Sequence, residues 1–468
     1  MIPINDFFSI LPALILALFG TALLLMHLDN SRIYPIFLLI GEAITAVALG
    51  RQSEFIGLKG FQGSIVIDHF SIYLNAVCLL GAVLSAIGAY RYLESQEEDS
   101  PEFYGLILLA QCGMFLMISG TELITVFIGI EITALSFYIL TGYLRTKSTS
   151  NEAAIKYLIL GAFSSALLLY GFSVLYGLSG ATRYANIASM LSARSPNDPL
   201  VILAVVPIVI GLLFKIAAAP LHMWAPDAYE GAPTPVTAYL STASKTAAFA
   251  VLLRLVLGPI HDFRPSWEAI IIFAALASLT VGNLAAITQV SAKRLLAYSS
   301  ISHAGYILLG LAAGNQIGIQ GMLMYLLVYT VMTTGAFLLL AAMPRDGVED
   351  FRGLLYRHPG IALTMVILLV SLAGLPPTAG FIAKYMIFVS LLQTRQYVLA
   401  IIAAVYVAVS IYYYFRIIRE MTQKPQDSPV HFELSVGWRA AVGVTALLTI
   451  GFGLNPEPLF GWVRNALR

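Results

Sequence analysis

The chain has 468 residues, 59% of them hydrophobic and only 11% charged, and its formal net charge is +1. A soluble domain carries about 25% charged residues, so this composition excludes an ordinary soluble domain and indicates a membrane protein with many spans. A net charge this close to zero creates no strong field for nucleic acid, and we expect no nucleic-acid partner.

The sequence has no pattern for a cofactor or a metal of its own. Cys78 and Cys112 both lie in apolar runs, where cysteine is typically a small core residue, and they form neither a disulfide framework nor a CxxC site. No group of His, Cys, Asp and Glu has metal-ligand spacing, and no GxGxxG or P-loop motif for a nucleotide is present. We therefore expect no cofactor-binding and no metal-binding residues in this chain.

Apolar runs of about 20 residues, the length that crosses a bilayer, predict fourteen membrane helices and an all-α fold. The first run follows no basic segment of the kind that begins a signal peptide, so it is interpreted as a retained helix. The helices are expected near residues 7–27, 33–50, 69–90, 103–120, 122–143, 153–178, 199–230, 234–257, 267–289, 293–314, 317–342, 360–392, 396–418 and 436–455. The seventh and the twelfth are too long for one straight span.

Two shorter segments are predicted between these helices. Residues 53–70 alternate around three glycines, a pattern that favours a short hairpin. Residues 181–193 place Tyr184, Ile187 and Leu191 on one helical face, which is typical of an amphipathic helix at the membrane interface.

Lysines and arginines predict the orientation, because they are enriched in the cytoplasmic loops of membrane proteins. If the N-terminus is outside, the inside segments carry twelve of these residues and the outside segments carry eight. Both termini are therefore expected outside.

The stretch from Leu212 to Arg254 contains two lysines within apolar runs, Lys215 and Lys245, and Pro220 interrupts the first run shortly after Lys215. A charge at the bilayer centre costs about 2.5–3.5 kcal/mol on insertion scales. A broken helix at that depth is tolerated only against protein or a hydrated cavity. A lysine side chain that reaches the interface is the alternative, but a broken helix combined with two lysines favours an ion path.

The run 360–392 repeats this arrangement, with Pro376 and Pro377 at its break and Lys384 after it. Interrupted helices at corresponding positions of two halves indicate a transporter site. Because each half would hold five helices, an odd number, the second is expected to be inverted in the membrane. The single membrane domain, 1–468, is accordingly divided into N-terminal helices one to three (1–102), a first repeat of helices four to eight (103–257), a second repeat of helices nine to thirteen (267–418), and the last helix with the C-terminus (436–468).

Two further titratable residues lie at depth in predicted helices. Glu131 is near the middle of its helix, where a lone glutamate would be neutral, and Lys215 is the partner expected to keep it ionised; a purely structural ion pair is the alternative. His303 stands among hydroxyl residues in KRLLAYSSISHAGY. Since histidine titrates near neutral pH, His303 is expected to relay protons towards Lys384, with hydrogen-bonded packing as the alternative.

Three residues are weaker candidates. Glu102 and Lys156 lie near predicted helix starts, where a solvated surface charge is the simpler interpretation. His222 follows Pro220 at the first break, where helix capping is as good an interpretation as proton transfer.

Three stretches, FKIAAAPLHMWAPDAYEGAPTPVTAYLSTASK, KRLLAYSSISHAGY and LPPTAGFIAKY, resemble the antiporter-like membrane subunits of respiratory complex I, the proton-pumping NADH:quinone oxidoreductase. Those subunits are related to subunits of Mrp-type sodium/proton antiporters, and the resemblance covers nearly the whole chain. Among the three such subunits the sequence is most similar to subunit N. It ends soon after the fourteenth helix, unlike subunit L, and it has Lys384 where subunit M usually has a glutamate.

The resemblance implies a proton-translocating subunit of this enzyme. It implies Glu131 and Lys215 as a coupled pair, Lys245 as the central relay, His303 as a linking group and Lys384 as the terminal lysine. FMN, iron–sulfur clusters and quinone would belong to other subunits, so no redox site is expected in this chain.

The same resemblance implies subunits M and K as membrane neighbours, subunits A and J nearby, and a location in the bacterial inner (plasma) membrane. Two other functions stay open. One is a stand-alone or Mrp-type cation/proton antiporter, and the other is a membrane subunit of a related hydrogenase.

Overall fold

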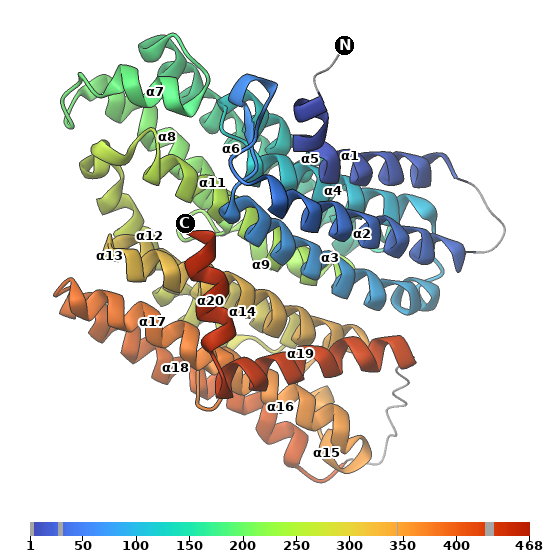
Figure 1. The fold of residues 1–468 in the computed structure, drawn as a ribbon. Helices are drawn as coiled ribbons and strands as arrows, with labels where there is room; N and C mark the ends of the chain where they lie inside the picture. The colour runs from blue at the N-terminus through green and yellow to red at the C-terminus, as the bar shows by residue number, and fades with distance from the viewer. Residues whose placement is uncertain (1–3, 27–30, 344, 426–434) are drawn as a thin grey trace.

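The structure is a computed structural model that describes residues 4–26, 31–343, 345–425 and 435–468, and it is built almost wholly of helices (Figure 1). The α-helices are α1 (Ile4–Leu25), α2 (Ile33–Gln52), α3 (His69–Ser95), α4 (Pro101–Ser119), α5 (Leu123–Thr141), α6 (Ser148–Ser179), α7 (Tyr184–Leu191), α8 (Pro199–Ile216), α9 (Trp224–Gly231), α10 (Thr234–Tyr239), α11 (Lys245–Leu257), α12 (Arg264–Thr288), α13 (Ala292–Ala313), α14 (Gln316–Ala341), α15 (Leu354–Arg357), α16 (Pro359–Ala373), α17 (Ala379–Gln393), α18 (Tyr397–Thr422), α19 (Val436–Leu454) and α20 (Glu457–Ala466). The short elements are β1 (Lys59–Gly60), β2 (Ile65–Val66), the 3₁₀ turns η1 (Ser53–Phe55), η2 (Phe61–Gly63), η4 (His261–Phe263) and η5 (Val348–Phe351), and the π-helical segment η3 (Leu240–Ser244).

Thirteen helices among the described residues are long and apolar enough to cross a membrane. The shorter apolar helices α16 and α17 together make one further, broken crossing. The fourteen predicted crossings are therefore present in the predicted order, and the all-α membrane fold is confirmed. An even number of crossings puts the start of α1 and the end of α19 on the same side, while the side that faces the cytoplasm stays a prediction.

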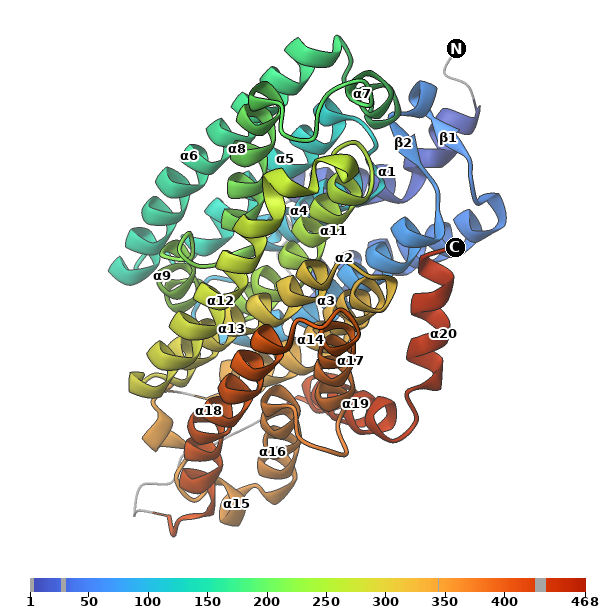
Figure 2. The same cartoon turned by 90° about the vertical axis from the view of Figure 1, so that its left-hand side faces the viewer.

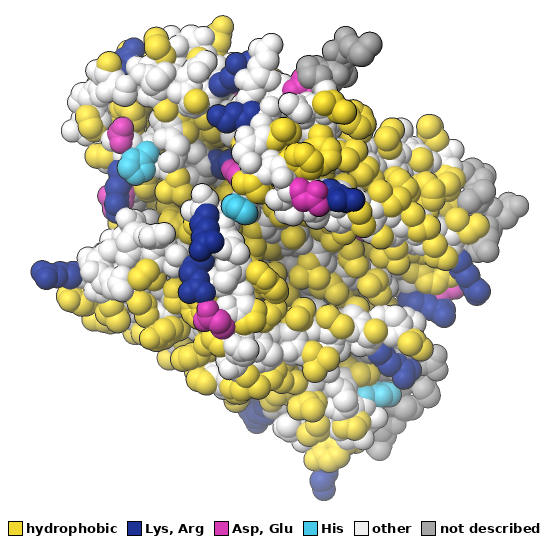
Figure 3. Space-filling model, viewed as in Figure 1, with side chains coloured by type: hydrophobic (Ala, Val, Ile, Leu, Met, Phe, Trp, Pro, Cys, Tyr) yellow, Lys and Arg dark blue, Asp and Glu magenta, His cyan; other side chains and the backbone are white. Residues whose placement is uncertain are grey.

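Apolar side chains cover the outside of the peripheral helices. Ile36, Ile40 and Ile44 of α2 and Leu158 and Ile159 of α6 are exposed. Figure 3 shows a broad hydrophobic face with most charged side chains near its margins. An exposed apolar surface this extensive is suited to lipid or to partner subunits.

By contrast, α13 and α14 form the centre of the molecule, and the most apolar window of α14 is wholly buried. Both helices lie between α11 on one side and α17 and α18 on the other, as Figures 1 and 2 show from two directions. A helix that is buried on every face has no side towards water. The hydrogen-bond partners of its polar side chains must therefore come from neighbouring helices.

The two predicted helix breaks are present. α8 ends before Ala217, which is left-handed with φ 59°, and α16 ends before Gly374, with φ 82°. Pro220 lies in the first gap, and Pro376 and Pro377 lie in the second; proline stops a helix because it lacks a backbone donor. Each break falls in the fourth crossing of a predicted repeat, while the inversion of the repeats and the four-part division of the chain stay predictions.

The two short predicted segments are also present. β1 pairs with β2 in an antiparallel hairpin, and α7 buries Tyr184, Ile187 and Leu191 on one face. The predicted helix at 234–257 is present as one continuous span, and within it the π-helical segment η3 joins α10 to α11 directly before Lys245. Such π segments occur frequently at functional sites.

Candidate functional site

Lys245 begins α11 and is only 2% exposed. Its ammonium donates a hydrogen bond of 3.0 Å to the carbonyl oxygen of Ser300 and a short one to the Ser300 hydroxyl. The ring of Tyr229 lies 5.9 Å from the ammonium. Because this side chain is enclosed, the alternative that it reaches the membrane interface does not fit, and its neutral partners suit a lysine that exchanges a proton.

His303 lies within a cluster of hydroxyl groups and is 3% exposed. Its Nδ1 is 2.7 Å from the Tyr325 hydroxyl, and its Nε2 is 3.1 Å from the Tyr414 hydroxyl. The Tyr414 hydroxyl shares a short hydrogen bond with Ser299. Hydroxyl groups both donate and accept hydrogen bonds, so this cluster can pass a proton in either direction.

Lys384 is held by the end of the broken helix. Its ammonium donates hydrogen bonds of 3.0 and 2.9 Å to the carbonyl oxygens of Leu372 and Ala373, and it lies 4.7 Å from the centre of the Tyr306 ring. The last carbonyls of a helix have no partner within it, and the C-terminal end carries partial negative charge. The break in α16 therefore creates the site that Lys384 occupies.

These three residues lie on either side of α13. Lys245 binds Ser300 of α13 from one side, and Lys384 packs on Tyr306 of α13 from the other. His303 lies between these positions on α13, and the charges of both lysines act on it. The structure thus brings Lys245, His303 and Lys384 together across the centre of the molecule.

Glu131 and Lys215 are arranged more loosely. The Lys215 ammonium donates to the Ser165 hydroxyl at 3.3 Å, and the charge of Glu131 acts on Lys215 without a direct ion pair among the described side chains. One carboxyl oxygen of Glu131, Oε1, is buried and has no hydrogen-bond partner in the described part of the chain. The coupled pair stays a prediction.

The weaker candidates lie apart from this row. Glu102 is exposed in the first turn of α4, which fits a solvated charge. His222 lies in the gap between α8 and α9, is 8% exposed, and has a buried Nδ1 with no hydrogen-bond partner in the described residues. Neither residue contacts Lys245, His303 or Lys384 through a described hydrogen bond.

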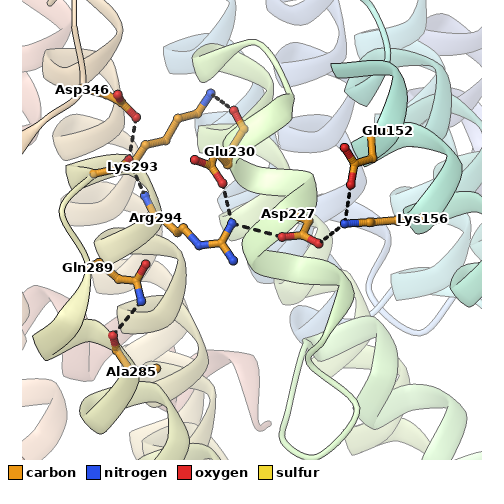
Figure 4. A network of polar contacts seen from close by, with 10 residues as sticks. Glu152, Lys156, Asp227, Glu230, Ala285, Gln289, Lys293, Arg294 and Asp346 are labelled. Carbon is orange, nitrogen blue, oxygen red and sulfur yellow. Dashed lines mark hydrogen bonds and ion pairs between the residues drawn. The ribbon is translucent and has the colours of Figure 1, made fainter. Parts of the chain in front are cut away.

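Lys156 belongs to a network of ion pairs that fastens α6, α9 and α13 together at one end (Figure 4). Its ammonium is 2.7 Å from Glu152 and 2.8 Å from Asp227. Arg294 continues the network to Asp227 at 3.1 Å and to Glu230 at 2.5 Å. This half-exposed position favours a structural clasp over a buried proton site.

The burial of Lys293 was not predicted from the sequence, in which Lys293 is one of the twelve Lys and Arg residues of the inside segments. In the structure Lys293 is 6% exposed, and its ammonium donates to the carbonyl oxygens of Glu230 and Ala232. Lys293 precedes Ser300 by two helical turns, so both residues lie on the same face of α13. Because that face meets Lys245, the spacing could have indicated that Lys293 is buried as well.

Glu42 on α2 is a further buried titratable residue that was not predicted as part of the site. It is 1% exposed and accepts a hydrogen bond of 3.0 Å from the Gln111 side chain.

Two interrupted helices and a central row of buried lysines are features typical of the class of ion-translocating membrane proteins. A family model described as NADH:quinone oxidoreductase/Mrp antiporter, transmembrane, matches residues 120–411. The NADH-quinone oxidoreductase subunit N 2 of Solibacter usitatus (strain Ellin6076) is 50% identical, and the match covers 99% of this chain and 98% of that protein. The chain therefore belongs to the NADH:quinone oxidoreductase/Mrp antiporter family, among its subunit N sequences.

Two solved structures show the same fold. A chain of respiratory complex I from Thermus thermophilus is 34% identical with a TM-score of 0.83, over 96% of this chain and 98% of that one. A chain of the Mrp complex from Dietzia sp. DQ12-45-1b is 20% identical with a TM-score of 0.85, over 99% of this chain and 97% of that one. At 20% identity, the match to the Mrp chain shows a shared fold and carries no statement about function.

Proposed function

We propose that this chain is a proton-translocating membrane subunit of an NADH:quinone oxidoreductase in a bacterial plasma membrane. Its family membership and its similarity to complex I support the assignment. The observation that carries it is the row formed by Lys245, His303 and Lys384, three buried groups that lie on or against α13, each beside a hydroxyl-bearing side chain.

In this proposal a proton on the Lys245 ammonium passes through the Ser300 hydroxyl towards His303, and His303 passes it through the surrounding tyrosines to Lys384. Every transfer forms one N–H or O–H bond for each one that breaks, so no electrons are exchanged. Moving one charge against 100 mV requires about 2.3 kcal/mol. That energy would come from quinone reduction in another subunit.

Glu131 and Lys215 would set the direction of transfer. When the Glu131 carboxylate is close, the protonated form of Lys215 is favoured; when the carboxylate withdraws or becomes hydrated, Lys215 releases its proton more readily. The Lys215 contact with Ser165, together with the free carboxyl oxygen of Glu131, fits a separated state of this pair.

The partners follow from the same proposal. Subunits M and K would adjoin this chain in the bilayer, with A and J nearby, and FMN, iron–sulfur clusters and quinone would be held by other subunits. The chain would thus be part of an enzyme without a redox active site of its own.

Copurification tests this assignment against the alternatives. When the affinity-tagged chain is extracted in mild detergent, we expect it to bring down a flavin-containing complex that oxidises NADH. A flavin-free assembly that exchanges sodium for protons would contradict the proposal and favour an Mrp-type antiporter, to which the fold is equally similar. A hydrogen-oxidising assembly would favour the hydrogenase alternative.

A further inference from the structure

A polar cavity of about 570 Å³ opens at one end of the molecule. It lies close to the network of Figure 4. The charged side chains along its wall are those of Lys147, Glu230, Lys293, Arg345 and Asp346, and Thr149 lies beside them. This end carries the loops in which Lys and Arg are enriched, which is the predicted cytoplasmic side.

Lys293 lies where this cavity meets the buried core. Its ammonium donates a hydrogen bond of 3.0 Å to the carbonyl oxygen of Glu230 and a second to Ala232, and Figure 4 shows the side chain extended towards Glu230. Both carbonyls lie at the C-terminal end of α9, where a helix leaves its last acceptors free. Lys384 occupies the same kind of position at the end of α16. Both lysines belong to the second half of the chain, but the half-helix ends that they bind, those of α9 and α16, come one from each half.

Two elements connect Lys293 to Lys245. Along α13, Lys293 and Ser300 are separated by two helical turns, about 10 Å, and Ser300 binds the Lys245 ammonium. Along α9, Tyr229 precedes Glu230 and presents its ring to Lys245 at 5.9 Å. The Tyr229 hydroxyl is buried and has no hydrogen-bond partner among the described residues, so it can still donate and accept.

We propose that this cavity takes up protons from the cytoplasmic side and that Lys293 is the first acceptor behind it; this inference rests on the function proposed above. A hydronium ion in the cavity gives its proton to the neutral amine of Lys293 and leaves a water molecule. The resulting ammonium gives a proton through the Tyr229 or Ser300 hydroxyl to the neutral amine of Lys245. In the first step an N–H bond forms at Lys293 as an O–H bond of the hydronium ion breaks, and in the second an N–H bond forms at Lys245 as one at Lys293 breaks. The charges of Asp346 and Glu230 act on Lys293 in the direction that favours its ammonium form, against the opposing charge of Lys147.

Blocking the cavity tests the uptake route. Thr149 is an exposed residue of the cavity wall, and the native thiols Cys78 and Cys112 are buried. In inside-out vesicles that contain the whole complex, a bulky charged thiosulfonate on Thr149→Cys should lower NADH-driven proton pumping about a hundredfold, the lower end of the range for a lost proton-transfer group. The parent complex with the same reagent gives the background of the other subunits.

The matched control is Glu349→Cys. Glu349 is an exposed residue that lines a neighbouring hollow at the same end of the molecule, and the labelled Glu349→Cys complex should pump normally. Full pumping by completely labelled Thr149→Cys would overturn the route.

Lys293→Arg tests the residue itself. Arginine keeps the positive charge and the donors that bind the α9 carbonyls, but it does not release a proton. If Lys293 transfers protons, Lys293→Arg and Lys293→Met should both lose pumping; if it only fastens α9, Lys293→Arg should pump normally, and that result would overturn the assignment. Should the arginine variant fail to assemble, the cavity labelling decides.

Lys245→Ala, measured in parallel, separates the two proposals. Impaired pumping in Lys245→Ala with normal pumping in Lys293→Arg and in labelled Thr149→Cys would refute the uptake site and leave the proposed function standing. Normal pumping in Lys245→Ala would refute the proposed function itself.

Discussion

Lys384 is held by two carbonyl groups that are free only because α16 stops at Ala373. Lys293 is held in the same way by the end of α9. A half-helix end supplies both free acceptors and partial negative charge, so a buried ammonium can be stabilised there without a carboxylate. Because its hydrogen bonds go to carbonyl groups and form no direct ion pair, such a lysine can give up its proton with less loss of favourable interaction than an ion-paired lysine would suffer.

The Glu131–Lys215 pair leads to a prediction from a double-mutant cycle. Glu131→Gln should impair pumping, and Glu131→Asp should impair it less because the charge is kept on a shorter side chain. Combining Glu131→Gln with Lys215→Met should destabilise the complex less than the sum of the single changes, by roughly 0.5–3 kcal/mol, since no unpaired charge is left.

Thermal unfolding and pumping of the four complexes measure this coupling. Simple additivity of the single and double changes would show that the two residues act independently.

Asp68 gives a pH-dependent prediction outside the membrane-spanning helices. It caps α3 through the backbone N–H of Ser71 at 2.7 Å, and it forms a two-point ion pair with Arg254 at 2.9 and 3.0 Å. Burial acts to raise the pKa of Asp68, but the charge of Arg254 and the hydrogen bonds from Arg254 and Ser71 outweigh it and hold the pKa below its usual range. The stabilisation is thus complete above the unfolded pKa of about 3.9 and is lost as the pH falls through the folded value.

Asp68→Ala should therefore destabilise the complex at pH 7 by about 1 kcal/mol for the lost cap, and further because Arg254 is left unpaired. Thermal unfolding should show that the difference from the parent shrinks below pH 4. Asp262→Ala is the control, because its side chain is 75% exposed in a surface pair and should contribute little. If Asp68→Ala lowered the stability of the complex by the same amount at pH 7 and below pH 4, the ion-pair account would be contradicted.

At the scale of helices, the second break places a glycine directly against a proposed proton carrier. Gly374 has a left-handed backbone with φ +82°, and a Cβ there would lie 2.6 Å from Cδ of Lys384. Gly374→Ala should therefore displace the Lys384 side chain from its carbonyl partners, in addition to about 1–2 kcal/mol of backbone strain.

We expect Gly374→Ala to reduce pumping in an assembled complex. Gly443→Ala is the matched control, since nothing lies within 4 Å of a Cβ built at Gly443, and it should leave both assembly and pumping unchanged. If Gly374→Ala pumped like Gly443→Ala, the position of Lys384 at the helix end would not matter for transfer.

The sequence indicated these breaks because proline marks them directly, and it indicated Lys245 and Lys384 because a charge within an apolar run is conspicuous. Lys293 was missed because it stands at a helix start, and its burial depends on α9, which packs over it from a distant part of the chain. The π-helical segment before Lys245 was missed because it changes backbone geometry without changing the apolar pattern. Helix α20 was not predicted either, because its ten residues are too few for a span and only Leu459, Val463 and Ala466 among them are buried.

At the scale of the whole molecule, fourteen crossings place both ends of the helix bundle on one side, and the distribution of Lys and Arg predicts that this side is outside. A cysteine at Glu349, in the exposed segment between α14 and α16, should react with a membrane-impermeant reagent only when the cytoplasmic face is accessible. Labelling of Glu349→Cys in right-side-out vesicles would contradict the predicted orientation. The cavity next to Lys293 would then open to the outside and not to the cytoplasm.

Lys245 lies at the centre of the proposed path. On one side of it are Lys293 and the cavity, and on the other side is the hydroxyl cluster around His303. In membrane vesicles, the complex with Lys245→Ala should assemble and should reduce an artificial electron acceptor with NADH normally. Its quinone-linked proton pumping should fall about tenfold or more, because the variant lacks the amine that binds Ser300. Normal pumping by Lys245→Ala would contradict the relay and would leave this lysine with a structural role alone.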